Sequence, residues 1–286
     1  MASRSPTVRQ RRLARALRQL RDDAGLTIEE VAEKLEISAS TVSRMETAHV
    51  GVRPRDLRYL LDIYGVTGGR RDDLLQIARE RRQQPWWQEF RDLPSIALTG
   101  LEADATSISQ YSVQLIPGLL QTMAYARVIL RAIRLDTEPE DIERRLTLRM
   151  DRQALLVGKE APRVWVVLDE AVLRRLVGGP QVMHEQLQRL IDASALPNVT
   201  IQVLPFVSGA HAGMDGEFTV LRYREPADPD VVYLENTGSD LYIERSDVTR
   251  RYNTTFEHLM ADALDPTESI RMLGNVQDEL QQSRRS

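Results

Sequence analysis

The sequence lacks cysteine altogether and is poor in histidine, which excludes several classes of site. A chain of 286 residues without cysteine can form neither disulfides nor a thiolate metal centre. The four histidines, at positions 49, 184, 211 and 258, are too scattered for a metal-ligand pattern. We therefore expect no metal ion and no other cofactor.

Long apolar runs are also missing. No segment approaches the roughly 20 apolar residues that a membrane-spanning helix needs. The Arg-rich start lacks the apolar segment that follows in a secretion signal. The sequence therefore predicts a cytoplasmic protein that makes no contact with a membrane, and its length allows two domains with cores of their own.

Two short helices joined by a tight turn are predicted between Leu26 and Val50. Thr27 and Glu30 have the spacing of a capping box, in which each side chain satisfies a free amide at the start of a helix. The first helix is therefore expected to begin at Ile28. Ser38 is the next good capping residue and starts the second helix. This layout is typical of a helix-turn-helix that reads DNA.

The second of these helices offers a surface that suits a DNA major groove. Val42 and Met45 continue its apolar face, so small and polar side chains point outward near its start. Small side chains allow close approach to base edges, hydroxyls can bond to bases or phosphates, and an arginine can bind guanine or phosphate. The outward residues are Ala39, Ser40, Ser43 and Arg44. The alternative is a hairpin of an ordinary helical bundle whose polar face is only solvated.

Neighbouring helices and the distribution of charge favour the DNA-binding interpretation. Apolar spacing predicts one helix before the pair, Thr7–Ala24, and two after it, Pro54–Tyr64 and Arg70–Gln83, which completes a module of five helices. Residues 1–84 carry 17 Lys plus Arg against 12 Asp plus Glu, or +5, and the remainder carries 21 against 30, or −9. A basic head on an acidic body is expected where binding to phosphates supplies much of the affinity. A head for a membrane surface is less favoured, because no long amphipathic helix with an aromatic face is present.

Residues 85–286 are predicted to form an α+β domain. Runs of branched and aromatic residues predict strands at Val164–Leu168, Val199–Pro205, Phe218–Tyr223 and Val231–Leu234. Helical spacing predicts helices at Thr122–Arg134, Glu138–Leu156, Pro180–Ala195, Val248–Ala263 and Glu268–Gln281. Strands with an intervening helix, followed by closely spaced strands, indicate a mixed sheet with flanking helices.

The predicted hinge between the two domains is Gln83–Thr99, which contains Trp86, Trp87 and Phe90 between prolines. An aromatic pair can serve as a ligand platform, but beside a domain boundary it is more often buried surface that joins two domains. We favour this structural interpretation of the pair.

The stretch LTIEEVAEKLEISASTVSRMET resembles the DNA-binding domain of the Cro/cI repressor type, also called the xenobiotic response element (XRE) family. In that family the second helix opens with a polar residue that contacts phosphate, and the third helix reads the major groove. The resemblance implies a phosphate contact at Thr27. The candidate DNA-binding residues are Thr27, Ser38, Ala39, Ser40, Thr41, Ser43 and Arg44.

Three positions depart from the pattern of that family. Ile28 stands where Gln is frequent, and Glu36 and Ala48 stand where glycines are frequent. At Glu36 a glycine commonly gives the turn a left-handed backbone, which costs another residue roughly 1–2 kcal/mol. A packed five-helix module can absorb that cost, so the fold is not threatened.

The stretches GLEADATSI, QLIPGLLQT and ALPNVTIQVLPFVSGAHAGMDGEFTVLRY resemble the C-terminal domain of WhiJ-like, antitoxin-like actinobacterial regulators. Such regulators are encoded beside a small partner protein. The resemblance therefore implies a sequence-specific regulator on the nucleoid that binds double-stranded DNA, acts as a repressor and works with a small protein encoded by a neighbouring gene. Heads of this type bind half-sites about 34 Å apart, which predicts a homodimer.

Two alternatives involve the glycine-rich loop Gly209–Gly216. A small molecule could bind at His211, Met214 and Asp215 and change the spacing of the DNA-binding heads. Ser208 with His211 and Asp215 also has the residue types of a hydrolase triad. Because no Gly-x-Ser-x-Gly elbow or phosphate-binding loop accompanies them, we predict no catalytic residues and no enzyme activity.

Overall fold

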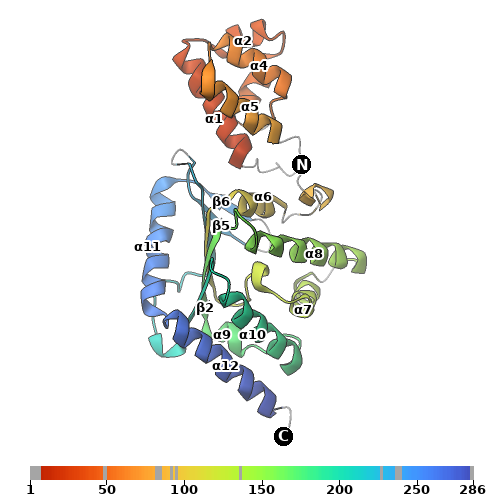
Figure 1. Ribbon diagram of the computed structural model, residues 1–286, viewed down its shortest axis with the longest axis vertical. Helices are drawn as coiled ribbons and strands as arrows, with labels where there is room; N and C mark the ends of the chain where they lie inside the picture. Colours follow the sequence, from red (N-terminus) through yellow and green to blue (C-terminus); the bar gives the residue numbers. More distant parts are fainter. Residues whose placement is uncertain are drawn as a thin grey trace. The chain divides into compact units, whose positions relative to one another are not determined.

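The computed structural model describes residues 8–47, 50–80, 86–90, 93, 96–134, 137–225, 228–235 and 240–283 (Figure 1). The chain divides into two compact units, Met1–Asp104 and Ala105–Ser286. Each unit has a hydrophobic cluster of its own. The predicted domain boundary, between residues 84 and 85, lies outside the described residues and stays a prediction.

The five predicted N-terminal helices are confirmed. They are α1 (Val8–Asp23), α2 (Ile28–Lys34), α3 (Ala39–Glu46), α4 (Pro54–Ile63) and α5 (Gly68–Glu80). Helix α2 begins at the predicted residue, and α3 begins directly after the predicted cap Ser38. The start of α4 at Pro54 also follows from the sequence, since proline has no N–H to lose in the first turn of a helix.

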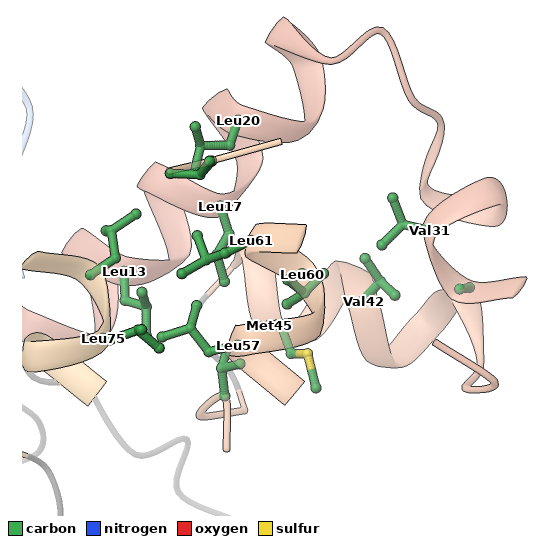
Figure 2. Packing of buried hydrophobic residues seen from close by; sticks show 14 residues of the cluster. Leu13, Leu17, Leu20, Val31, Val42, Met45, Leu57, Leu60, Leu61 and Leu75 are labelled. Carbon is green, nitrogen blue, oxygen red and sulfur yellow. The ribbon is translucent and has the colours of Figure 1, made fainter. Parts of the chain in front are cut away.

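The core of this unit is built from the apolar faces of its helices (Figure 2). Leu17 of α1 and Leu57 and Leu61 of α4 are at most 1% exposed. Val31 of α2 and Val42 of α3 belong to the same cluster. Truncating a core leucine to alanine costs about 2–5 kcal/mol, so this cluster is a large part of what holds α2 and α3 in place.

The turn between α2 and α3 has the left-handed backbone expected at its glycine-like position. Glu36 has φ 54°, and among the described residues it is the one non-glycine with positive φ. The glutamate therefore carries a strain that glycine would avoid. Ala48, the other position where glycine is frequent, lies outside the described residues.

The second unit contains a mixed six-stranded sheet in the order β3-β2-β1-β4-β5-β6, which confirms the α+β prediction. Strands β1, β2 and β3 are parallel to one another, and β4, β5 and β6 each run antiparallel to their preceding neighbour. The strands are β1 (Ser107–Ser112), β2 (Arg163–Asp169), β3 (Val199–Leu204), β4 (Phe218–Arg222), β5 (Val231–Leu234) and β6 (Leu241–Ile243). The sequence did not predict β1, which lies in the middle of the sheet, or the short β6.

Helices cover both faces of this sheet. They are α7 (Met123–Ile133), α8 (Pro139–Arg152), α9 (Glu170–Arg174), α10 (Pro180–Ser194), α11 (Ser246–Asp262) and α12 (Pro266–Ser283). Figure 1 shows α11 along one face and α7, α8 and α10 along the other. Phe256 and Leu259 of α11 share a cluster with Tyr111, Val167 and Phe218, so α11 closes the core on its side.

The predicted hinge contains more regular structure than expected. Trp86–Phe90 forms a short 3-10 helix, η1, and α6 (Ile96–Asp104) starts before the predicted hinge ends. Phe90 is buried and Trp87 half-buried, while the side chain of Trp86 lies outside the described residues. The structural interpretation of the tryptophan pair stays a prediction.

Candidate nucleic-acid interface

The start of α2 is fixed by the predicted capping box. The Thr27 hydroxyl accepts a hydrogen bond from the Glu30 N–H at 3.2 Å, and the Thr27 N–H donates to Glu30 Oε2 at 2.8 Å. This backbone donor lowers the pKa of the Glu30 carboxyl, and the Thr27 hydroxyl adds to the effect at 3.1 Å. Thr27 thus has a structural role beside a carboxylate, and its contact with phosphate stays a prediction.

The start of α3 is fixed in a similar way. Ser38 Oγ accepts from the Thr41 N–H at 3.2 Å and lies 2.8 Å from Thr41 Oγ1. Near the other end, Thr47 Oγ1 donates to the Ser43 carbonyl at 2.8 Å. These bonds give α3 defined ends, so the side chains between them are presented from a rigid helix.

Of the four residues predicted to point outward from α3, two are exposed and two are half-buried. Ser40 and Arg44 are exposed and lie one turn apart, on one face of α3. Ser43 is half-buried, and Ala39 is half-buried and packs against the core rather than pointing freely outward. No described residue forms a hydrogen bond or ion pair with the Arg44 side chain, so its guanidinium is available to a ligand.

A buried ion pair joins α3 to α1. Arg21 Nε and Nη2 donate to the two carboxylate oxygens of Glu46 at 2.8 and 3.0 Å, and Nη1 donates to the Leu26 carbonyl at 2.9 Å. The side chains of Arg21 and Glu46 are 11% and 5% exposed. The hydrogen bond to Glu46 raises the pKa of the Arg21 guanidinium. The pair holds α3 against α1 and was not apparent from the sequence, where Arg21 was only one of seven arginines near the start.

A basic hollow of about 600 Å³ lies beside α3. Its walls come from the end of α2, one face of α3 and the start of α4. The charged side chains that line it are Lys34, Arg53 and Arg55, with Glu36 and Asp56. Arg53 caps α4 without a side-chain bond to its amides, which leaves N–H groups at this helix start for an anion. This hollow was not predicted from the sequence, although the two arginines that flank Pro54 at a helix start are a signal for it.

The residues of the predicted ligand loop do not gather at one site. His211 Nδ1 accepts from the Gly213 N–H at 3.2 Å, and its ring meets the Tyr111 ring edge-on at 5.9 Å. The Met214 side chain is 70% exposed. Of the three predicted residues, Asp215 lines a cleft in the second unit, and the other two do not.

The hydrolase alternative gains no geometric support. The Ser208 hydroxyl donates to the Asp262 carbonyl at 3.1 Å, and His211 is bonded to its own loop. Across the described ranges, no hydrogen bond connects Ser208, His211 and Asp215. The part of the chain that the structure describes also contains no group of three or more His, Asp or Glu side chains that could hold a metal ion, and no helix that could span a membrane.

Two family models match the chain. Residues 12–74 match a helix-turn-helix domain, and residues 96–275, well over half of the chain, match a domain of unknown function (DUF5753). No curated protein and no solved structure matches. The first match indicates a DNA-binding regulator of transcription.

Proposed function

We propose that this chain, which belongs to the DUF5753 family, is a sequence-specific transcriptional repressor that reads the major groove with α3. The observation that carries the proposal is Arg44, whose exposed guanidinium has no partner among the described residues. The helix that bears it is capped by Ser38 and fixed to α1 through Glu46. A rigid helix with a free arginine suits bidentate recognition of guanine.

The other contacts divide into base and phosphate contacts. Ser40 shares the exposed face of Arg44 and is placed to meet a base edge, with Ala39, Thr41 and Ser43 beside it. Thr27 and Ser38, at the starts of α2 and α3, are proposed to contact phosphates. Arg53 and Arg55 at the start of α4 extend the phosphate contacts, since helix starts and basic side chains both attract anions.

The proposed repressor is a homodimer on a palindromic site. Helix α3 has 8 residues, so it is about 12 Å long and reads only one half-site. Two-fold symmetric pairs of such heads place their reading helices about 34 Å apart. DNA as the ligand also places the protein in the cytoplasm, on the nucleoid.

A small protein encoded by a neighbouring gene is proposed to bind the second unit, in a control pair of the antitoxin-like or developmental kind. The resemblance to WhiJ-like and XRE-family actinobacterial regulators is the first support. Exposed apolar side chains on the segment 206–214 are the second. Phe206 is 59% exposed, Val207 is 91% exposed and Met214 is 70% exposed. Apolar side chains gathered at a surface often mark a protein interface.

Genome-wide mapping of bound DNA in the source organism tests the repressor proposal. The parent chain should occupy a small set of palindromic sites, and Arg44→Ala should lose them. Arg70→Ala, which removes an exposed arginine from α5, is the matched control and should keep them. Raised transcription beside these sites after deletion of the gene would establish repression. Identical maps for the parent and Arg44→Ala would show that α3 does not read the DNA.

A further inference from the structure

A cleft of about 690 Å³ in the second unit lies outside every contact discussed for DNA. Five parts of the chain line it: the residues after β1, the loop 212–217, the end of β5, the end of α7 and one face of α11. Helix α11 contributes Val248, Arg251, Tyr252 and Thr255. A cleft of this size can enclose a small organic molecule.

The topology of the sheet explains why a cleft opens here. Val113 directly follows β1, and Glu217 directly precedes β4, which runs antiparallel to β1. On its other side β1 pairs with β2 in parallel. The cleft therefore lies beyond the carboxyl end of β1, where the sheet changes from parallel to antiparallel. In open sheets, ligands bind outside the carboxyl ends of strands, at the point where the direction of winding reverses.

The loop on one side of the cleft is held rigidly. A Cβ atom on Gly213 would lie 2.4 Å from a ring carbon of Tyr111, so the loop backbone packs directly on that buried ring. Gly216 has φ 124°, a conformation that side chains disfavour. The loop therefore presents Asp215 and Glu217 to the cleft from a fixed backbone.

One part of the cleft lining, called the floor below, is aromatic and apolar. The rings of Phe218 and Tyr252 meet edge-on with centroids 4.9 Å apart. Phe218 is 4% exposed, and Val113, Leu234 and Val248 add apolar surface. Such a floor favours a hydrocarbon or aromatic body over a fully hydrated ion.

Among the described residues, three carboxyls and two arginines line the cleft. Of the carboxyls, Glu217 is half-buried, and Asp215 and Glu235 are exposed. Glu217 accepts a hydrogen bond from the Val113 N–H, and neither Glu217 nor Glu235 is paired with a cation in the described parts of the chain. Burial raises the pKa of Glu217, and the neighbouring Glu235 raises it further.

The two cations of the lining are placed differently. Arg134 is half-buried at the end of α7. Burial raises the pKa of Asp240, and the charge of Arg134 opposes this rise. The Arg134 Nε has no hydrogen-bond partner in the described parts of the chain. Arg251 is exposed on α11.

We propose that this cleft binds an organic cation, a protonated amine with an aromatic or aliphatic body, whose ammonium group lies against Glu217 and Glu235 and whose body lies on Phe218 and Tyr252. An ammonium group supplies the counter-charge that the carboxyls lack, and the aromatic rings attract a cation as well. The cleft holds a neutral or anionic analogue less well, because the carboxyls stay uncompensated. A role of this cleft in regulation depends on the proposed repressor function, whereas binding of the amine does not depend on it.

Calorimetric titration of the full chain near neutral pH tests the binding. The probes are 2-phenylethylamine, the neutral 2-phenylethanol and the anionic 3-phenylpropionate, which share one body. We expect the amine to bind at least about tenfold more tightly than either analogue, in line with a charge-assisted contact. Equal binding of the amine and the alcohol, or preference for the carboxylate, overturns the proposal.

Two variants and a control locate the site. Glu217→Gln and Glu235→Gln should each weaken binding of 2-phenylethylamine by about tenfold, because each removes a carboxylate proposed to contact the ammonium group. Glu257→Gln changes an exposed carboxyl of α11 that does not line the cleft and should leave the affinity unchanged. A thermal melt of each variant confirms folding, and unchanged affinity in both cleft variants contradicts the assignment.

The DNA-binding proposal is tested separately. Glu217→Gln without amine should bind the operator as the parent does, since it changes no residue of α3. Loss of amine binding with intact operator binding therefore bears only on the cleft. Loss of operator binding in Arg44→Ala with intact amine binding bears only on α3.

Discussion

The two units leave charges of opposite sign without a partner. In the first unit, the guanidinium of Arg44 is exposed and unpaired among the described residues. In the second, Glu217 and Glu235 line a cleft with no cation bonded to them within the described ranges. A charge near apolar surface is costly until water or a ligand compensates it. These charges are the basis on which we propose an anionic ligand for the first unit and a cationic ligand for the second.

A second comparison, within the first unit, shows that residue type alone does not give a role. Arg21 and Arg44 are both helical arginines of the DNA-binding module. Arg21 is buried against Glu46 and holds α3 in place, whereas Arg44 extends from α3 into solvent. One is structural and the other is available for binding, so replacing them should affect different measurements.

The largest effect is expected from breaking the buried pair. Glu46→Ala removes the buried carboxylate from the Arg21 guanidinium and leaves it an ion pair at 2.7 Å with the exposed Asp22. This change should lower the free energy of unfolding of the first unit by about 3 kcal/mol. Urea unfolding followed by circular dichroism measures this loss. The double variant Arg21→Met with Glu46→Met should recover much of it, because no uncompensated charge remains.

A surface pair provides the control for this prediction. Arg127 and Glu143 are bonded at 3.0 and 3.1 Å, but their side chains are 35% and 51% exposed. Glu143→Ala should change the unfolding midpoint little, because water replaces the lost partner. A Glu46→Ala protein as stable as Glu143→Ala would show that burial of the Arg21 pair is not what matters.

The next effect concerns DNA and sharpens the contrast between Arg21 and Arg44. Arg44→Ala should weaken operator binding by about 1–3 kcal/mol without a change in stability, if the arginine reads a base. Arg55→Ala should weaken binding to all sequences alike and reduce the slope of affinity against salt by about 1, since Arg55 is proposed to contact phosphate. Fluorescence anisotropy on operator and scrambled DNA over a range of salt measures both. If Arg44→Ala loses the same affinity for operator and for scrambled DNA, Arg44 contacts a phosphate and not a base.

A smaller effect is expected at the turn between the helices. Glu36 has φ 54°, so Glu36→Gly relieves left-handed strain and should stabilise the first unit by about 1 kcal/mol. Some of the gain is lost because glycine is more flexible in the unfolded chain. Thermal unfolding gives the difference, and operator affinity should not fall, since the change removes a carboxylate from the lining of the basic hollow. A destabilised Glu36→Gly protein would mean that the glutamate side chain stabilises the turn by more than its backbone costs.

Features of the fold that depend on local sequence were predicted, and those that depend on distant partners were not. The caps at Thr27 and Ser38 bond to amides three residues away, so their spacing alone predicts them. The pairing of Arg21 with Glu46 spans 25 positions and has no local signal. The left-handed Glu36 was expected only because the resemblance indicates a glycine-like position there.

The central strand β1 was missed for a physical reason. Its residues, SISQYS, include three serines and a glutamine, and Ser109 and Ser112 are 4% and 1% exposed. A strand covered on both faces does not need to alternate, and small polar residues hide its burial. The cleft beyond its end was missed with it. Of the three predicted ligand residues His211, Met214 and Asp215, only Asp215 lines that cleft, because the position of the cleft depends on how β1, β4 and α11 meet.

The smallest expected effect is a difference in the pH dependence of stability between Glu217→Gln and the parent, which tests the charge in the cleft. The raised pKa of Glu217 means that the folded state favours the neutral carboxyl, so its contribution to stability is complete below the unfolded pKa and is lost as pH rises through the folded value. Glu217→Gln stays neutral. It should therefore match the parent at low pH and become more stable than the parent as pH rises past that value.

Other charged groups at the cleft could produce a similar pH profile, and the amine distinguishes them. Charge in the lining also comes from Glu235, Asp215, Arg134 and Arg251. Glu235→Gln is therefore measured beside Glu217→Gln over the same pH range. Saturating 2-phenylethylamine should remove the advantage of Glu217→Gln, because the ammonium group makes the ionised carboxyl favourable in the parent. If Glu217→Gln stays more stable than the parent with the amine bound, the amine does not compensate the charge of Glu217. The contrast in ligand charge between the two units would then depend on Arg44 alone.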